Sequence, residues 1–169
     1  MPNWVKRVTK ERAEDLGAGE TLVAATYFQG RGSTMAQVSF GAAAGIVGGA
    51  IGNRLGVDAQ QRFLSKGKEG YNTFPGSLAS HVPDDKGVLA VTSDRVIVFA
   101  YHQGALKTRI EAPVLAVAVA DLVGWSYRPG KLAGVVNLAF SDGSDVGIEV
   151  PRANRPEEFV TTLGIPQES

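Results

Sequence analysis

The stretch GVLAVTSDRVIVFAY, residues 87–101, decides the fold. It contains two runs of β-branched and aromatic residues, 88–92 and 95–101, and such residues favour extended strands. Ser93 and Asp94 separate the two runs, and both residue types are frequent in tight turns. The stretch therefore predicts a β-hairpin at the centre of an antiparallel sheet.

Further strands are expected on both sides of this hairpin. Residues 19–30 are β-branched or aromatic and are bounded by glycines, which predicts a strand before it. An alternating pattern after it predicts a third strand, with Leu106, Thr108 and Ile110 on one face and Lys107, Arg109 and Glu111 on the other. Residues 114–130 are apolar for most of their length, and they fit either a buried strand or a short helix followed by a strand.

The last two expected strands form a second hairpin. Residues 132–140 and 145–151 flank the tetrapeptide Ser141-Asp142-Gly143-Ser144, and an Asp-Gly pair is a strong hairpin signal. Residues 128–131, RPGK, form the turn that precedes it. Six strands thus follow the strand at 19–30, and hairpins join most of them.

Each end of the chain predicts a helix. Residues 3–16 form an amphipathic helix whose apolar residues are Trp4, Val5, Val8 and Leu16, ended by Gly17 and Gly19. Either this helix packs on the domain, or it anchors the protein in lipid headgroups through Trp4 and the basic residues Lys6, Arg7, Lys10 and Arg12.

The C-terminal helix is expected over residues 153–164. Asn154 is a possible N-cap near Pro156, Phe159 and Leu163 lie four residues apart on one face, and Gly164 ends the helix. An amphipathic helix in this position can close one open end of a curled sheet.

The hairpin and the later strands resemble the bacterial pleckstrin-homology-like and GRAM-like domain family. The hairpin pattern of that family, L-x-x-T-x-x-R-[VL]-x-x-[FY], is matched by Leu89, Thr92, Arg95, Val96 and Phe99. ADLVGWSY, residues 120–127, and LAFSDGSDVGIEV, residues 138–150, look like the D-[IL] strand start and the DG hairpin that follow in the family. The resemblance covers residues 19–30 and 87–164.

The resemblance implies a mainly β (α+β) fold, an antiparallel β-barrel capped by the C-terminal helix. Thr92, Asp94 and Arg95 are then turn and edge residues rather than a binding site. The implied organisation is an N-terminal helix at 1–18 and a barrel domain at 19–169, interrupted by an insertion at 31–86. The family suggests peptide or lipid binding without choosing between them.

The insertion contains a glycine-rich segment, GAAAGIVGGAIGNRLG, residues 41–56. On a helix its glycines fall within an arc of about 100°, and they are Gly41, Gly45, Gly48, Gly49, Gly52 and Gly56. Six helical glycines cost roughly 5 kcal/mol relative to alanine, so something must pack closely against the bare backbone. We expect a glycine-zipper helix at about 35–56.

Four environments remain open for this segment. Residues 35–52 are uncharged and 18 residues long, at the lower limit of a membrane span, although their hydropathy is modest. The alternatives are reversible contact with a membrane or a second copy, packing within the same chain, and a glycine-rich loop. If a rim of the barrel faces anionic lipid, the cations near hairpin ends could serve it, namely Lys107, Arg109, Arg128 and Lys131.

Composition narrows the function classes. Seventeen basic and seventeen acidic residues give a net charge of zero, which argues against bulk nucleic-acid binding. There is no cysteine, and His81 and His102 lack metal-ligand spacing, so we expect no metal and no cofactor. We expect a non-catalytic binding or scaffolding module that associates with a membrane or with itself through the glycine-zipper helix, and that is cytoplasmic or peripheral to the inner face of the membrane. Its partner is itself, another protein or a membrane surface, and no small-molecule substrate is identified. The alternative is a soluble homo-oligomeric protein-interaction domain with no membrane contact.

Overall fold

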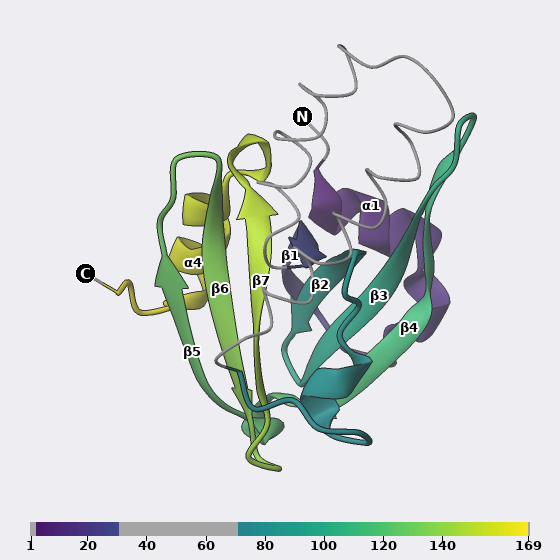
Figure 1. The fold of residues 1–169 in the computed structure, drawn as a ribbon. Helices are drawn as coiled ribbons and strands as arrows, with labels where there is room; N and C mark the ends of the chain where they lie inside the picture. The colour runs from purple at the N-terminus through teal and green to yellow at the C-terminus, as the bar shows by residue number, and fades with distance from the viewer. Residues whose placement is uncertain (1–2, 31–70, 169) are drawn as a thin grey trace.

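The computed structural model describes residues 3–30 and 71–168. Within these residues one seven-stranded sheet has the order β4-β3-β2-β1-β7-β6-β5, and all its pairings are antiparallel (Figure 1). The strands are β1 Leu22–Gly30, β2 Lys86–Thr92, β3 Arg95–Gln103, β4 Thr108–Ala118, β5 Leu122–Arg128, β6 Ala133–Phe140 and β7 Asp145–Pro151. The expected mainly β fold and the central hairpin are therefore confirmed.

The sheet curls around one main core. β1 lies between the two halves and pairs with β2 on one side and with β7 on the other. Side chains from both halves meet inside, including Phe28, Val98, Val136, Phe140 and Ile148. The β-branched residues of the central hairpin alternate between this core and a second one on the outer face, which explains why both of its strands are apolar throughout.

The sheet is not closed into a barrel. In the described residues β4 and β5 are the two edges, and no ladder joins them, so the closed barrel expected from the resemblance is corrected. The C-terminal tail instead covers part of β5. The Tyr127 amide donates to the Pro166 carbonyl at 2.8 Å, and the Glu168 amide donates to the Tyr127 carbonyl at 2.7 Å. Backbone groups that closure would have paired are here partly satisfied by the tail.

Residues 71–85 belong to the folded domain. They include the 3-10 helix η2, Leu78–His81, and they place Ala79 and Val82 in the main core. The Asn72 amide donates to Asp145 Oδ1 and the Leu78 amide to Asp142 Oδ2, each at 2.7 Å. This part of the expected insertion at 31–86 is thus attached to the β6–β7 hairpin.

The C-terminal helix α4, Pro156–Leu163, packs against the core as expected. It buries Phe159 and Val160, and Gly164 ends it with a φ of 63°. The expected N-cap was wrong. Asn154 lies in the short 3-10 helix η4, Arg152–Asn154, while Arg155 occupies the cap position with a φ of 49° and no side-chain cap bond. Asn154 Oδ1 instead accepts a hydrogen bond from Trp4 Nε1 at 3.1 Å.

The N-terminal helix α1, Trp4–Glu11, is shorter than expected, and the 3-10 helix η1, Ala13–Asp15, follows it. Asn3 Oδ1 caps α1 by accepting from the Lys6 amide at 3.0 Å. Trp4 and Val8 are buried on the outer face of the sheet among Tyr27, Val88, Ala90, Ile97, Phe99 and Ile110. The helix therefore packs on the domain, and the alternative that places Trp4 in lipid headgroups does not hold for this conformation.

The third strand and the apolar run after it also depart from expectation. Leu106 lies in the β3–β4 turn, and β4 begins only at Thr108. The run at 114–130 continues β4 to Ala118, then forms η3, Val119–Asp121, and β5. The sequence left open either a buried strand or a short helix followed by a strand, whereas the structure has the end of one strand, a 3-10 turn and a second strand, and alternate residues of β4 are exposed. The exposed residues lie on the outer face of β4, where only Ile110 packs in the cluster under α1, while Leu115 and Val117 face the main core. Apolar periodicity alone does not reveal which face of a strand is covered.

Candidate functional site

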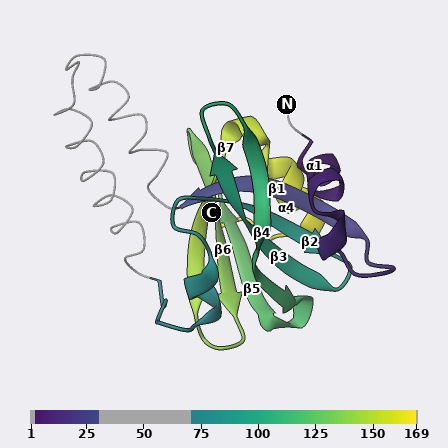
Figure 2. The same ribbon diagram turned by 90° about the vertical axis from the view of Figure 1, so that its right-hand side faces the viewer.

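Two hairpin turns, each with an exposed leucine beside a lysine, form the most distinctive surface of the described residues. Residues 104–107, GALK, join β3 to β4, and residues 129–132, PGKL, join β5 to β6. The side chain of Leu106 is fully exposed, and that of Leu132 is 45% exposed. Both turns lie at the same end of the molecule, the upper end in Figures 1 and 2. We call them the β3–β4 tip and the β5–β6 tip.

The four cations expected at a lipid-facing rim fall into two pairs, one pair on each of these hairpins. Arg109 Nε lies 2.6 Å from Glu111 Oε1, and Arg128 Nε lies 3.8 Å from Glu168 Oε2. Lys107 and Lys131 are exposed, and no ion pair is formed by either of them within the described part of the chain. The structure does not gather the four into one patch, and the two lysines carry the charge that is free to attract an anion.

Helix α1 holds the base of the β3–β4 hairpin. Arg7 Nη2 donates to the Thr108 carbonyl at 3.0 Å, and the Ile110 amide donates to Glu11 Oε2 at 2.9 Å. Arg7 Nε also lies 2.6 Å from Glu11 Oε1. Burial alone would raise the pKa of Glu11. The hydrogen bonds from the Ile110 amide and the Arg7 guanidinium outweigh burial, so the net shift of this pKa is downward. These contacts satisfy part of the free edge of β4 and fix the hairpin below its tip.

The β5–β6 tip is held at its own base. The Arg152 amide donates to the Leu132 carbonyl at 3.0 Å, which ties the tip to the segment after β7. A Cβ atom at Gly130 would lie 2.1 Å from the Ala133 carbonyl oxygen, so this tight turn requires glycine. Both tips are therefore supported by backbone contacts while their leucine and lysine side chains project outward.

An aromatic cluster packs beneath α1, close to the β3–β4 hairpin. The Trp4 ring stacks on Tyr27 with the centroids 5.6 Å apart, and Tyr101 meets both rings edge-on. The Arg7 guanidinium lies 5.3 Å from the Trp4 ring centroid and 5.2 Å from that of Tyr101. Such cation–π and aromatic contacts give α1 a defined seat on the sheet.

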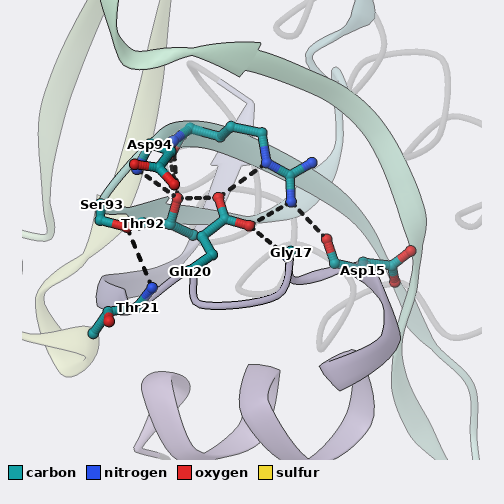
Figure 3. Close-up of polar contacts among 8 residues, drawn as sticks. Asp15, Gly17, Glu20, Thr21, Thr92, Ser93 and Asp94 are labelled. Carbon is teal, nitrogen blue, oxygen red and sulfur yellow. Dashed lines mark hydrogen bonds and ion pairs between the residues drawn. The ribbon is translucent and has the colours of Figure 1, made fainter.

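A second polar network, centred on Glu20, lies at the other end of β2 and β3 (Figure 3). Arg95 donates to both carboxylate oxygens of Glu20, with Nε at 2.9 Å and Nη2 at 2.6 Å. Thr92 Oγ1 and the Gly17 amide also donate to this carboxylate. Chiefly because of the Arg95 hydrogen bonds, the pKa of Glu20 falls to about 2 despite its burial. Thr92 and Arg95 thus have a structural role, consistent with their reading as turn and edge residues.

Other candidates from the sequence fall in different places. The glycine segment with Gly41, Gly45, Gly48, Gly49, Gly52 and Gly56 lies outside the described residues. His81 Nδ1 contacts the Ser77 carbonyl at 2.9 Å, and His102 is exposed on β3. Within residues 3–30 and 71–168 there is no cluster of three potential metal ligands. In the same ranges, no helix has the length and apolar character needed to cross a membrane.

Sequence reasoning found the lysines and arginines of the tips but missed the leucines beside them. The available signal was the repeated pattern of glycine, leucine and lysine in GALK and GKL, residues 104–107 and 130–132. It also missed Glu20, because nothing local to that residue indicates a partner 75 positions away. Searches of protein-family models, curated proteins and solved structures find no match for this chain.

Proposed function

We propose that the protein is a non-catalytic, pleckstrin-homology-like binding module that attaches reversibly to an anionic membrane surface at the cytoplasmic side. The fold part of this proposal is supported by the curled antiparallel sheet, the closing helix α4 and the positions of the motif residues. Leu89, Val96 and Phe99 fill core positions of the β2–β3 hairpin, while Thr92 and Arg95 stabilise its turn.

The observation that carries the membrane proposal is the pair of tips at one end of the molecule. A leucine transferred from water into the acyl region contributes about 1.5–3 kcal/mol when fully buried. A lysine near an anionic surface contributes about 1 kcal/mol. Two leucines and two lysines acting together therefore support weak binding that weakens as salt screens the lysines. Exposed leucines at both tips have no evident role in folding, since neither contributes to a core.

The glycine segment supplies a second proposed contact, argued from sequence alone. A helix with its glycines on one face needs a closely packed partner. We assign this segment to the membrane surface or to a second copy of the chain. Replacing Gly45 and Gly49 by isoleucine would block close approach and leave both hairpin tips intact, so its contribution can be separated from theirs.

Vesicle flotation tests the proposal. We expect the intact protein to float with vesicles containing phosphatidylserine and not with phosphatidylcholine alone. A Lys107→Gln, Lys131→Gln variant should float less, because both changes remove tip charge. A Lys6→Gln, Lys10→Gln variant is the matched control, since it removes the same charge from two exposed residues of α1 that belong to neither tip. Absence of flotation on anionic vesicles, or equal losses in the two variants, would contradict the proposed surface.

Self-association is a second candidate, favoured by the outer side of β4. Val114, Ala116 and Ala118 are exposed there, and Val119 continues the apolar surface into η3. Contiguous apolar surface of this kind is typical of contacts between proteins. The edge itself is less suited to strand addition, because Pro113 lacks an amide hydrogen and irregular register interrupts the ladder nearby. A side-by-side contact therefore fits better than a continuous intermolecular sheet.

The solution mass distinguishes the two modes of self-association. A dimer disrupted by Ala116→Lys and unaffected by Gly45→Ile, Gly49→Ile would place the contact on β4. The reverse result would place it on the glycine segment. A monomer at micromolar concentration would refute this second candidate and leave the membrane proposal standing.

A further inference from the structure

A pocket of about 380 Å³ lies on the outer face of the sheet, between the start of α1 and the ends of β1, β2 and β3. One wall is aromatic and consists of Trp4, Tyr27 and Tyr101. The polar lining includes Lys86, Gln103 and Asn154. Gln103 immediately precedes the turn at 104–107, so the pocket adjoins the β3–β4 tip.

The polar side chains are arranged so that their donors remain available. Lys86 Nζ donates to Gln103 Oε1 at 2.9 Å. This contact occupies the side-chain oxygen of Gln103 and leaves the side-chain NH₂ group of Gln103 able to donate to a ligand. Trp4 Nε1 donates to Asn154 Oδ1 at 3.1 Å, and the side-chain NH₂ group of Asn154 is likewise left able to donate to a ligand. Within the described residues neither side-chain NH₂ group has an acceptor. The ammonium group of Lys86 carries three hydrogens, and its contact with Gln103 uses one of them.

The charge of the pocket favours an anion. Lys86 lines it, and no carboxylate does. Arg7 adds a second positive group behind the aromatic wall, although its charge is shared with Glu11. The nearest acid along the chain, Asp85, is engaged by the Lys86 amide at 2.7 Å. Asp85 still lies close enough to add to the effect of burial in raising the pKa of the lining residue Tyr27, so it is the acid that an anion would approach. Three nitrogen donors from three separate segments line the pocket, and none of its lining side chains is a carboxylate.

We propose that this pocket binds a phosphate monoester. Such a group offers several strong acceptor oxygens and negative charge, and it matches an ammonium group and two amide NH₂ groups. The volume is at the small end of the range for ligand sites, which suits a compact headgroup. The phosphate comes either from a lipid headgroup or from a soluble metabolite. The lipid source rests on the proposed membrane function, whereas the soluble source does not.

Titration with glycerol 3-phosphate, followed by NMR or calorimetry on the intact protein, tests the pocket. We expect binding that is weakened about tenfold in a Lys86→Met, Gln103→Met variant, because two of the three donors are lost. Lys10→Met is the control and should bind as the unchanged protein does. If the double variant unfolds, a Lys86→Gln variant replaces it. This variant loses the positive charge but keeps a donor, so we expect its affinity for glycerol 3-phosphate to lie between those of the unchanged protein and the double variant. No binding by the unchanged protein, or equal binding by the double variant, overturns the inference.

Flotation on two vesicle types of equal charge identifies the source. Phosphatidic acid carries a phosphate monoester and phosphatidylserine does not. Stronger flotation on phosphatidic acid, lost in the Lys86→Met, Gln103→Met variant, identifies a lipid headgroup. Binding of glycerol 3-phosphate without that preference identifies a soluble ligand. Flotation on both vesicles without any binding of glycerol 3-phosphate would overturn the pocket while leaving the membrane proposal intact.

Discussion

Glu20 joins the segment after η1 to the β2–β3 turn. Its side chain is 3% exposed, and it accepts hydrogen bonds from Arg95, Thr92 and the Gly17 amide. Glu20→Gln should lower the free energy of unfolding at pH 7 by about 2 kcal/mol, since it removes charge from a charge-assisted network whose Arg95 is partly solvated. Urea unfolding measures this change. Glu158→Gln, in an exposed ion pair with Arg155, should have almost no effect, and equal losses would contradict the structural role of Glu20.

The same residue predicts a pH dependence. The pKa of Glu20 falls from 4.5 to about 2 on folding, so the unfolded chain binds its proton first as the pH decreases. The stabilisation is therefore fully present above about pH 4.5 and is lost as the pH falls towards 2. The stability difference between the unchanged protein and Glu20→Gln should shrink over this interval. A difference that stays constant between pH 6 and pH 2.5 would contradict the depressed pKa.

Two glycines in neighbouring strands give a matched test of packing. A Cβ atom at Gly134 would lie 2.2 Å from the ring of Tyr127, whereas one at Gly124 would lie 3.7 Å from its nearest neighbour, the Ala139 Cβ. Gly134→Ala should therefore destabilise the protein by about 1–3 kcal/mol, and Gly124→Ala should change its stability by no more than about 0.5 kcal/mol. Thermal unfolding of the two variants measures the contrast. Similar values for both would show that Tyr127 does not pack on Gly134 as described.

At the scale of elements, α1 stabilises the hairpin that carries one tip. Trp4 is 7% exposed and makes aromatic, cation–π and hydrogen-bond contacts. Trp4→Ala should cost about 3–5 kcal/mol and release α1. Hydrogen exchange at the Ile110 amide, which donates to Glu11, should then become faster. Lys10→Ala on the same helix is the control. Unchanged protection in Trp4→Ala would mean that α1 does not hold the hairpin.

The sequence predicted elements well where the pattern is local. The β2–β3 hairpin was predictable because two β-branched runs flank a turn, and α4 was predictable from Pro156, Phe159 and Gly164. The exposure of alternate residues at the start of the run at 114–130 was not predictable, because it depends on which part of the sheet α1 covers. The N-cap of α4 was missed for a related reason, since the distant residue Trp4 engages Asn154.

The candidate site was predictable in part. The cations near hairpin ends were identified, but strand order and turn direction determine which turns share one end of the molecule. Leu106 was assigned to a strand, and its exposure follows only from the start of β4 at Thr108. The lining of the proposed phosphate pocket brings together residues from both ends of the chain, and no spacing in the sequence indicates that.

At the scale of the whole molecule, both tips lie at one end of the domain, and we propose that this end faces the membrane. One curled sheet, with α4 and η2 packed against its main core, carries the two tips, and the donor-rich pocket lies near the β3–β4 tip. We propose that the lysines attract an anionic surface, that the leucines enter it, and that the pocket selects a phosphate group. Binding to the surface should therefore weaken with increasing salt, while the leucine contribution remains.

The most direct test uses the absence of cysteine from the chain. Leu106→Cys, Leu132→Cys and Val123→Cys each give a unique site for an environment-sensitive fluorophore, and Val123 is an exposed control at the opposite end of β5. On phosphatidylserine vesicles we expect a blue shift for probes at positions 106 and 132 and no shift at position 123. A shift at all three positions, or at position 123 alone, would contradict the proposal that the two tips form the membrane-binding surface.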